Sequence, residues 1–206
     1  MMGEHGRRAS WVALAVVALG VGSLVVNITS DAQLSGDQQV LFGIRRTFSL
    51  LLNAGTVWAG ISVLAGAVMR HLRPAAVAGL LAGSGALVVH YGVGVITGLM
   101  PVGSFSSNAM WFLAAAMSGA PLGLVGAVAR SRTRWGIAAR LVVPLGAVIE
   151  PWFAGWWLSP DVDSLAVRAS SLVAAGTLTV VGLAAIVYAV RAVAAATTAS
   201  EVGRVR

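Results

Sequence analysis

The chain consists mainly of long apolar runs separated by short polar segments. A helix needs about 20 residues to cross the roughly 30 Å of hydrocarbon in a bilayer. Such runs must be helical in lipid, because no water is present to satisfy open backbone groups. Six runs qualify and predict one all-α domain over residues 1–206, a polytopic membrane bundle of about six transmembrane helices. The predicted spans are 11–28, 48–69, 75–98, 109–129, 136–158 and 165–190.

The arginines alternate between the two sides of this predicted bundle. One set of loops and termini carries 11 Arg and two Glu, a net charge of +9. The opposite set carries three Arg and four Asp, a net charge of −1. Because cytoplasmic loops are enriched in basic residues, the pattern predicts that both termini are cytoplasmic. The four acids expected outside are Asp31, Asp37, Asp161 and Asp163.

Composition supports a membrane protein. Hydrophobic residues make up 58% of the chain and charged residues only 10%, whereas a soluble domain carries about a quarter charged residues. The net charge of +7 is explained by membrane topology, so the expected partner is the lipid bilayer and not nucleic acid. The absence of cysteine excludes disulfides and thiol chemistry. All basic residues are Arg, and with the abundant Ala, Val and Gly this indicates a GC-rich bacterium and its inner membrane.

Glycine spacings predict where the helices pack closely. The pairs Gly79–Gly83, Gly94–Gly98 and Gly119–Gly123 have the GxxxG spacing. Small residues at this spacing let helix backbones approach closely in lipid. The third and fourth spans are therefore predicted to use these faces as helix contacts.

Three polar residues interrupt the apolar runs at a similar depth. At 1.5 Å per residue, His90 and Glu150 lie about 22 Å and 21 Å from the inner ends of their spans, and Asn53 about 24 Å. Polar and ionisable residues inside a membrane are costly and mark functional sites. Tyr91 and Trp152 fall at nearly the same height.

One arrangement that accounts for this level is a cavity open to the outside, with a few polar groups among aromatic side chains. Its predicted ligand-binding residues are Asn53, His90, Tyr91, Glu150 and Trp152, with Trp156 and Trp157 completing a wall or lid, and Arg45, Arg46 and Arg168 at the rim. In the alternative interpretation Glu150 and His90 pair with each other and only fix the packing. Arg45 and Arg46 either anchor the chain at the interface or capture an anion.

The sequence leaves three functions open. The first is a transport-related protein that binds a small solute from outside, and the alternative is a structural or regulatory subunit of a membrane complex with membrane-protein partners. A third is an intramembrane enzyme with Glu150 and His90 as acid and base. No hydrolase, metalloprotease or P-loop motif is present, so no catalytic residue is assigned. One His and one Glu are too few for a metal site, and no cofactor is expected.

Several segments resemble a family of small actinobacterial integral membrane proteins classed as a domain of unknown function. They are LNAGTVW at 52–58, VVHYGVGV around His90, WFLAAAMSGAPLGLVGAVAR at 111–130 and GAVIEP around Glu150. This resemblance covers roughly residues 40–190 and implies no activity. In architecture alone, the chain is similar to the substrate-capture (S) subunits of energy-coupling-factor vitamin transporters. That likeness implies a vitamin-sized solute and an ATPase-driven partner.

Overall fold

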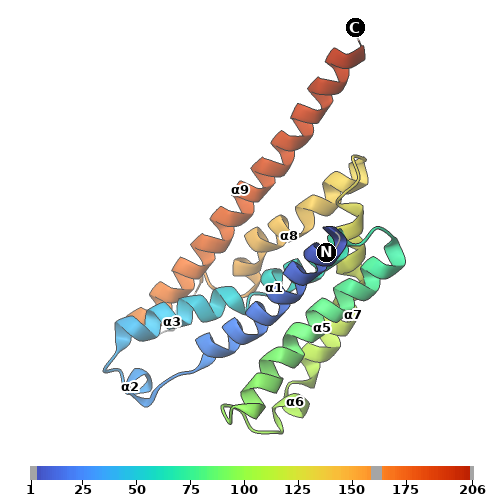
Figure 1. Cartoon of the computed structure of the whole chain (residues 1–206). Coiled ribbons are helices and arrows are strands. Elements are labelled where there is room, and N and C mark those ends of the chain that lie inside the picture. Colours follow the sequence, from blue (N-terminus) through green and yellow to red (C-terminus); the bar gives the residue numbers. More distant parts are fainter. Residues whose placement is uncertain (1–3, 159–163, 205–206) are drawn as a thin grey trace.

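The computed structural model describes residues 4–158 and 164–204, and every regular element within them is a helix (Figure 1). Five helices are long and apolar enough to cross a membrane, and a bent pair makes a sixth candidate span. The chain is therefore an all-α, multi-pass membrane protein. In order the helices are α1 (Glu4–Asn27), α2 (Asp31–Leu34), α3 (Gln39–Leu52), α4 (Gly55–Val68), α5 (Leu72–Ile96), α6 (Ser104–Ser107), α7 (Ala109–Val128), α8 (Arg134–Phe153) and α9 (Leu165–Arg204).

The second predicted span, 48–69, is wrong as a single continuous helix. Two helices, α3 and α4, meet there at an angle of 42°. Ala54 between them has an extended backbone, with φ −60° and ψ 131°. Residues 29–47, which lie between the first two predicted spans and were expected to form a loop, contain α2 and the first part of α3. A broken helix in lipid exposes backbone groups that must find partners elsewhere.

Glycines bring α4, α5 and α7 into backbone contact. A Cβ added to Gly79 would lie 2.4 Å from the Gly119 carbonyl oxygen, and one added to Gly66 would lie 2.0 Å from that of Gly123. A Cβ on Gly123 would lie 2.1 Å from the Ala75 carbonyl oxygen. The packing predicted from small residues on the third and fourth spans is therefore present.

In the Gly94–Gly98 pair only Gly94 makes the helix contact that was predicted, because a Cβ on Gly94 would lie 3.3 Å from the Leu24 side chain of α1 and one on Gly98 would meet nothing within 4 Å. Gly98 follows α5 with a φ of +72°, which glycine adopts without a steric penalty. The Met100 N–H donates to the Gly94 carbonyl oxygen at 2.9 Å and closes the end of the helix. Gly98 therefore terminates α5.

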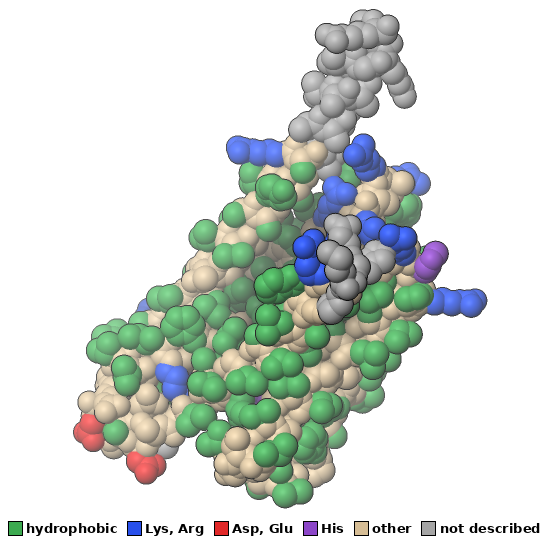
Figure 2. Space-filling view, viewed as in Figure 1, with side chains coloured by type: hydrophobic (Ala, Val, Ile, Leu, Met, Phe, Trp, Pro, Cys, Tyr) green, Lys and Arg blue, Asp and Glu red, His purple; other side chains and the backbone are tan. Residues whose placement is uncertain are grey.

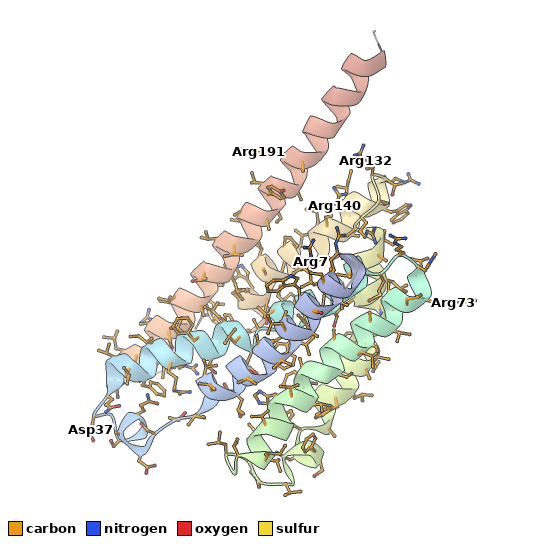
Figure 3. The ribbon with its side chains drawn as sticks, viewed as in Figure 1. Arg7, Asp37, Arg73, Arg132, Arg140 and Arg191 are labelled. Carbon is orange, nitrogen blue, oxygen red and sulfur yellow. The ribbon has the colours of Figure 1, made fainter. Side chains whose placement is uncertain are left out.

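Charge separates the two ends of the bundle. Figure 3 labels Arg7, Arg73, Arg132, Arg140 and Arg191 near one end, here called the arginine end, and Asp37 near the opposite, acidic end. Figure 2 shows the same division on the surface, with most blue side chains gathered at one end and the red ones at the other. Helix α1 begins and α9 ends toward the arginine end (Figure 1). Asp161 and Asp163, which the sequence assigns to the acidic side, lie outside the described residues.

Candidate functional site

Glu150 of α8 binds the first residues of α4, at the break in the second span. Its Oε1 accepts a hydrogen bond from the Gly55 N–H at 2.6 Å, and its Oε2 accepts one from the Thr56 N–H at 2.8 Å. The Thr56 hydroxyl also donates to Oε2. The first N–H groups of any helix lack partners within it, and they carry a partial positive charge. Glu150 therefore supplies the cap that the break requires.

The other side of the break is also satisfied by side chains. Leu52 is the last residue of α3, and its carbonyl oxygen accepts a hydrogen bond from the Trp58 indole N–H at 2.9 Å. Asn27, at the end of α1, accepts hydrogen bonds through Oδ1 from Ser49 Oγ at 2.6 Å and from Asn53 Nδ2 at 3.0 Å. The break is thus a polar junction of α1, α3, α4 and α8.

His90 of α5 is bound to α1 and not to Glu150. Its Nδ1 lies 2.6 Å from Ser23 Oγ, and Ser23 Oγ donates to the Gly20 carbonyl oxygen at 3.1 Å. A serine hydroxyl has only one hydrogen. We therefore assign the ring proton to Nδ1, which leaves Nε2 as an acceptor. His90 is buried, with 5% of its surface exposed.

A cavity of about 620 Å³ brings these groups together. Three helices supply most of its walls through residues three or four positions apart, which lie on one face of each helix. The lining is Gly55, Trp58, Ala59 and Ser62 of α4, Gly83, Leu87, His90 and Tyr91 of α5, Trp111, Ala114, Ala115, Ser118 and Leu122 of α7, together with Asn27, Asn53 and Glu150.

The structure places four of the five predicted ligand-binding residues on this cavity: Asn53, His90, Tyr91 and Glu150. Trp152 does not line it, so the predicted aromatic wall needs correction. Trp152 packs on Trp157 instead, with ring centroids 5.8 Å apart. It lies at the end of α8, beyond Glu150, where 61% of its surface is exposed.

The predicted arginine rim also differs from the structure, because Arg45, Arg46 and Arg168 do not line the cavity. Arg45 donates to the Val26 carbonyl oxygen at 2.7 Å, near the end of α1. A cation at this position stabilises the partial negative charge of a helix C-terminus. Arg45 thus has a role at a helix end that explains its position at the acidic end.

The pairing predicted between His90 and Glu150 is not found. Among the described residues they share no hydrogen bond or ion pair, and each binds other partners. Within the same residues, no group of three His, Asp or Glu side chains could hold a metal ion.

Comparison with protein-family models, with curated proteins and with solved structures found no match to this chain. The family resemblance of the four sequence segments stays a prediction. The geometry of the cavity and of the broken helix is therefore the guide to function.

Sequence reasoning missed five residues that matter here: Ser23, Asn27, Thr56, Trp58 and Trp111. The clearest available signal was Asn53 followed by Gly55 in the middle of an apolar run, since both residues disfavour a helix interior. An apolar stretch that reaches back to the start of α3 is also long for one span. No sequence signal identified Thr56, because its role depends on Glu150, 94 positions away.

Proposed function

We propose that this protein captures a small solute from the outer side of a bacterial cell membrane and takes part in its transport. The observation that carries the proposal is the cavity of about 620 Å³ next to a broken helix. Binding sites for small molecules have volumes of roughly 300–1,000 Å³, with apolar and aromatic walls and a few polar groups. Membrane transporters commonly form substrate sites at discontinuous helices.

The position of the cavity supports capture from the acidic side. Trp111 lies in the first turn of α7 and Asn27 ends α1, and these helix ends lie toward the acidic end (Figure 1). The arginine distribution favours the opposite end as cytoplasmic. A solute from outside would therefore meet the polar junction at Asn53 and Glu150 first.

Native mass spectrometry of the gently extracted protein tests this proposal. Ala115 lines the cavity beside Gly83, whereas its neighbour Ala116 is exposed and does not line it. We expect the wild-type protein to retain a small molecule, and we expect Ala115→Phe to lose it because the ring fills the cavity. Ala116→Phe adds the same ring outside the cavity and should retain the molecule. Equal retention by both variants, or a wild type that carries only lipids, would overturn the proposal.

A structural or regulatory subunit is the second candidate. It is favoured by one observation, namely that Glu150 and His90 already have partners within the chain. In that case the polar junction exists only to support the bent span. The same experiment separates the candidates, because a structural subunit would be extracted with a fixed protein partner and with an empty cavity.

A further inference from the structure

The cavity is polar at one end and apolar at the other. Asn53 and Glu150 lie at the start of α4, toward the acidic end. Leu122 lies 11 residues further along α7 than Trp111, which corresponds to about 16 Å. A ligand that fills the cavity would therefore have a polar head at the broken helix and an apolar body directed toward the middle of the bilayer.

Glu150 and His90 offer free hydrogen-bond acceptor positions to the cavity. Glu150 uses three of its roughly four acceptor positions on α4, which leaves one available. His90 Nε2 is an acceptor without a hydrogen-bond partner among the described residues. Ser62 is 2% exposed, lines the cavity, and its hydroxyl has no hydrogen bond within the described part of the chain. A ligand that donates hydrogen bonds would satisfy Glu150 and His90, whereas the Ser62 hydroxyl can either donate or accept.

The charge that touches the cavity is negative. Among the described residues that line the cavity, Glu150 is the only Asp, Glu, Arg or Lys. Arg45 is the nearby cation that binds the end of α1, and it does not reach the lining. Trp58, Tyr91 and Trp111 add aromatic faces, which attract cations electrostatically. An organic anion would meet Glu150 without a counter-charge on the wall.

We propose that the cavity binds an amphipathic organic cation, an amine whose head donates to Glu150 and His90 close to the rings of Trp58 and Trp111 and whose apolar body points toward Leu87 and Leu122. This inference rests on the proposed solute-binding function and names its substrate class. The head lies where α4 begins, so the ligand shares Glu150 with the first N–H groups of α4. The body occupies the space between α4, α5 and α7, beside Leu87 and Leu122.

The test compares three probes that share one skeleton and differ only in the head: 4-phenylbutylamine, 4-phenylbutanol and 4-phenylbutyrate. Binding is measured by tryptophan fluorescence of the protein in nanodiscs of zwitterionic lipid, with empty nanodiscs as the correction for partitioning into lipid. We expect the amine to bind about tenfold more tightly than the alcohol, from its charge and its cation–π contacts, and the carboxylate to bind most weakly.

Two variants locate the binding. Trp111 and Trp152 are each 61% exposed, but only Trp111 lines the cavity, so Trp111→Leu should weaken amine binding and Trp152→Leu should not. Glu150→Gln keeps one acceptor oxygen for α4 but removes the charge, and it should bring the amine close to the alcohol. If this variant does not fold, the order of the three probes on the wild type still decides the ligand class.

The outcomes separate the two proposals. If the alcohol or the carboxylate binds as tightly as the amine, and Ala115→Phe blocks that binding, the cation inference is overturned and the solute cavity stands. If no probe binds and the extracted wild type retains no small molecule, both proposals fail. If Trp152→Leu weakens amine binding as much as Trp111→Leu does, the amine binds elsewhere on the protein and the inference is overturned.

Discussion

At the scale of single residues, Glu150 shows how a carboxylate can be kept inside a membrane span. Its oxygens bind two backbone N–H groups and one hydroxyl on α4. In lipid an unpaired backbone N–H costs several kcal/mol. The carboxylate removes this cost at the break, and the N–H groups in turn stabilise the buried carboxylate. The sequence predicted that Glu150 and His90 lie at a similar depth in the bilayer. A similar depth does not determine which groups Glu150 binds.

Removing the Glu150 side chain should destabilise the protein strongly. Glu150→Ala leaves the Gly55 and Thr56 N–H groups without acceptors, at an expected cost of about 2–6 kcal/mol in the free energy of unfolding. Thr56→Val removes only the hydroxyl contact and should cost about 1 kcal/mol. Reversible unfolding in mixed detergent micelles measures both values. Equal stability of Glu150→Ala and the wild type would mean that the carboxylate does not cap α4.

The tautomer of His90 is a second prediction at this scale. With the ring proton on Nδ1, the ¹⁵N spectrum of histidine-labelled protein should show Nδ1 as protonated and Nε2 as unprotonated. The chain has three His residues, so the His90 signals are those missing from His90→Gln. Ser23→Ala removes the acceptor of the Nδ1 proton and should shift the Nδ1 signal. A protonated Nε2 in the wild type would contradict the assignment and remove an acceptor from the cavity.

At the scale of helices, the sequence predicted five of the spans but missed the break in the second one and the short helices α2 and α6. Five apolar runs became helices, because hydrophobic length decides spanning segments. Their ends differ in places from the predicted ones: α1 begins at Glu4 and not at 11, α8 ends at Phe153 and not at 158, and α9 continues to Arg204 and not to 190. The break near Ala54 was not predicted, since it depends on a long-range cap from Glu150. Four of the predicted site residues line the cavity, and they had been predicted from their similar depth in the bilayer. Trp152 did not, because depth fixes neither the rotation of a helix nor its neighbours.

The glycine contacts of α5 and α7 give a prediction at this scale. Gly123→Ala places a methyl group where the Ala75 carbonyl oxygen lies 2.1 Å away, so the helices must separate. We expect a loss of about 1–3 kcal/mol in the free energy of unfolding from this overpacking.

Gly92→Ala is the matched control on α5, because a Cβ at Gly92 meets nothing within 4 Å. It should leave stability unchanged or raise it by about 0.5–1 kcal/mol, since alanine favours a helix over glycine. Thermal unfolding of the two variants under one detergent condition makes the comparison. A Gly123→Ala variant as stable as Gly92→Ala would show that α5 and α7 are not in backbone contact.

At the scale of the whole molecule, arginine has two roles that overlap. Arg130 donates to the Met69 carbonyl oxygen after α4, and Arg140 donates to the Ala129 carbonyl oxygen after α7. Both therefore close helix ends while they contribute to the charge of the arginine end. Arg45 does the same for α1 at the acidic end. By the distribution of arginines alone, Arg45 is a basic residue on the side where few are expected. Its hydrogen bond to the end of α1 explains why an arginine is present there.

The orientation of the bundle decides from which side a solute reaches the cavity, and cysteine labelling tests it. The chain has no native cysteine, so a single introduced thiol is the only labelled group. Asp37 and Arg132 are exposed at opposite ends of the bundle. In intact bacterial cells, a membrane-impermeant maleimide should label Asp37→Cys, and it should label Arg132→Cys only after the cells are opened. The positive-inside tendency is the physical reason. The reverse pattern would turn the cavity mouth toward the cytoplasm, and a role in solute capture from outside would then be wrong even if the cavity binds amines.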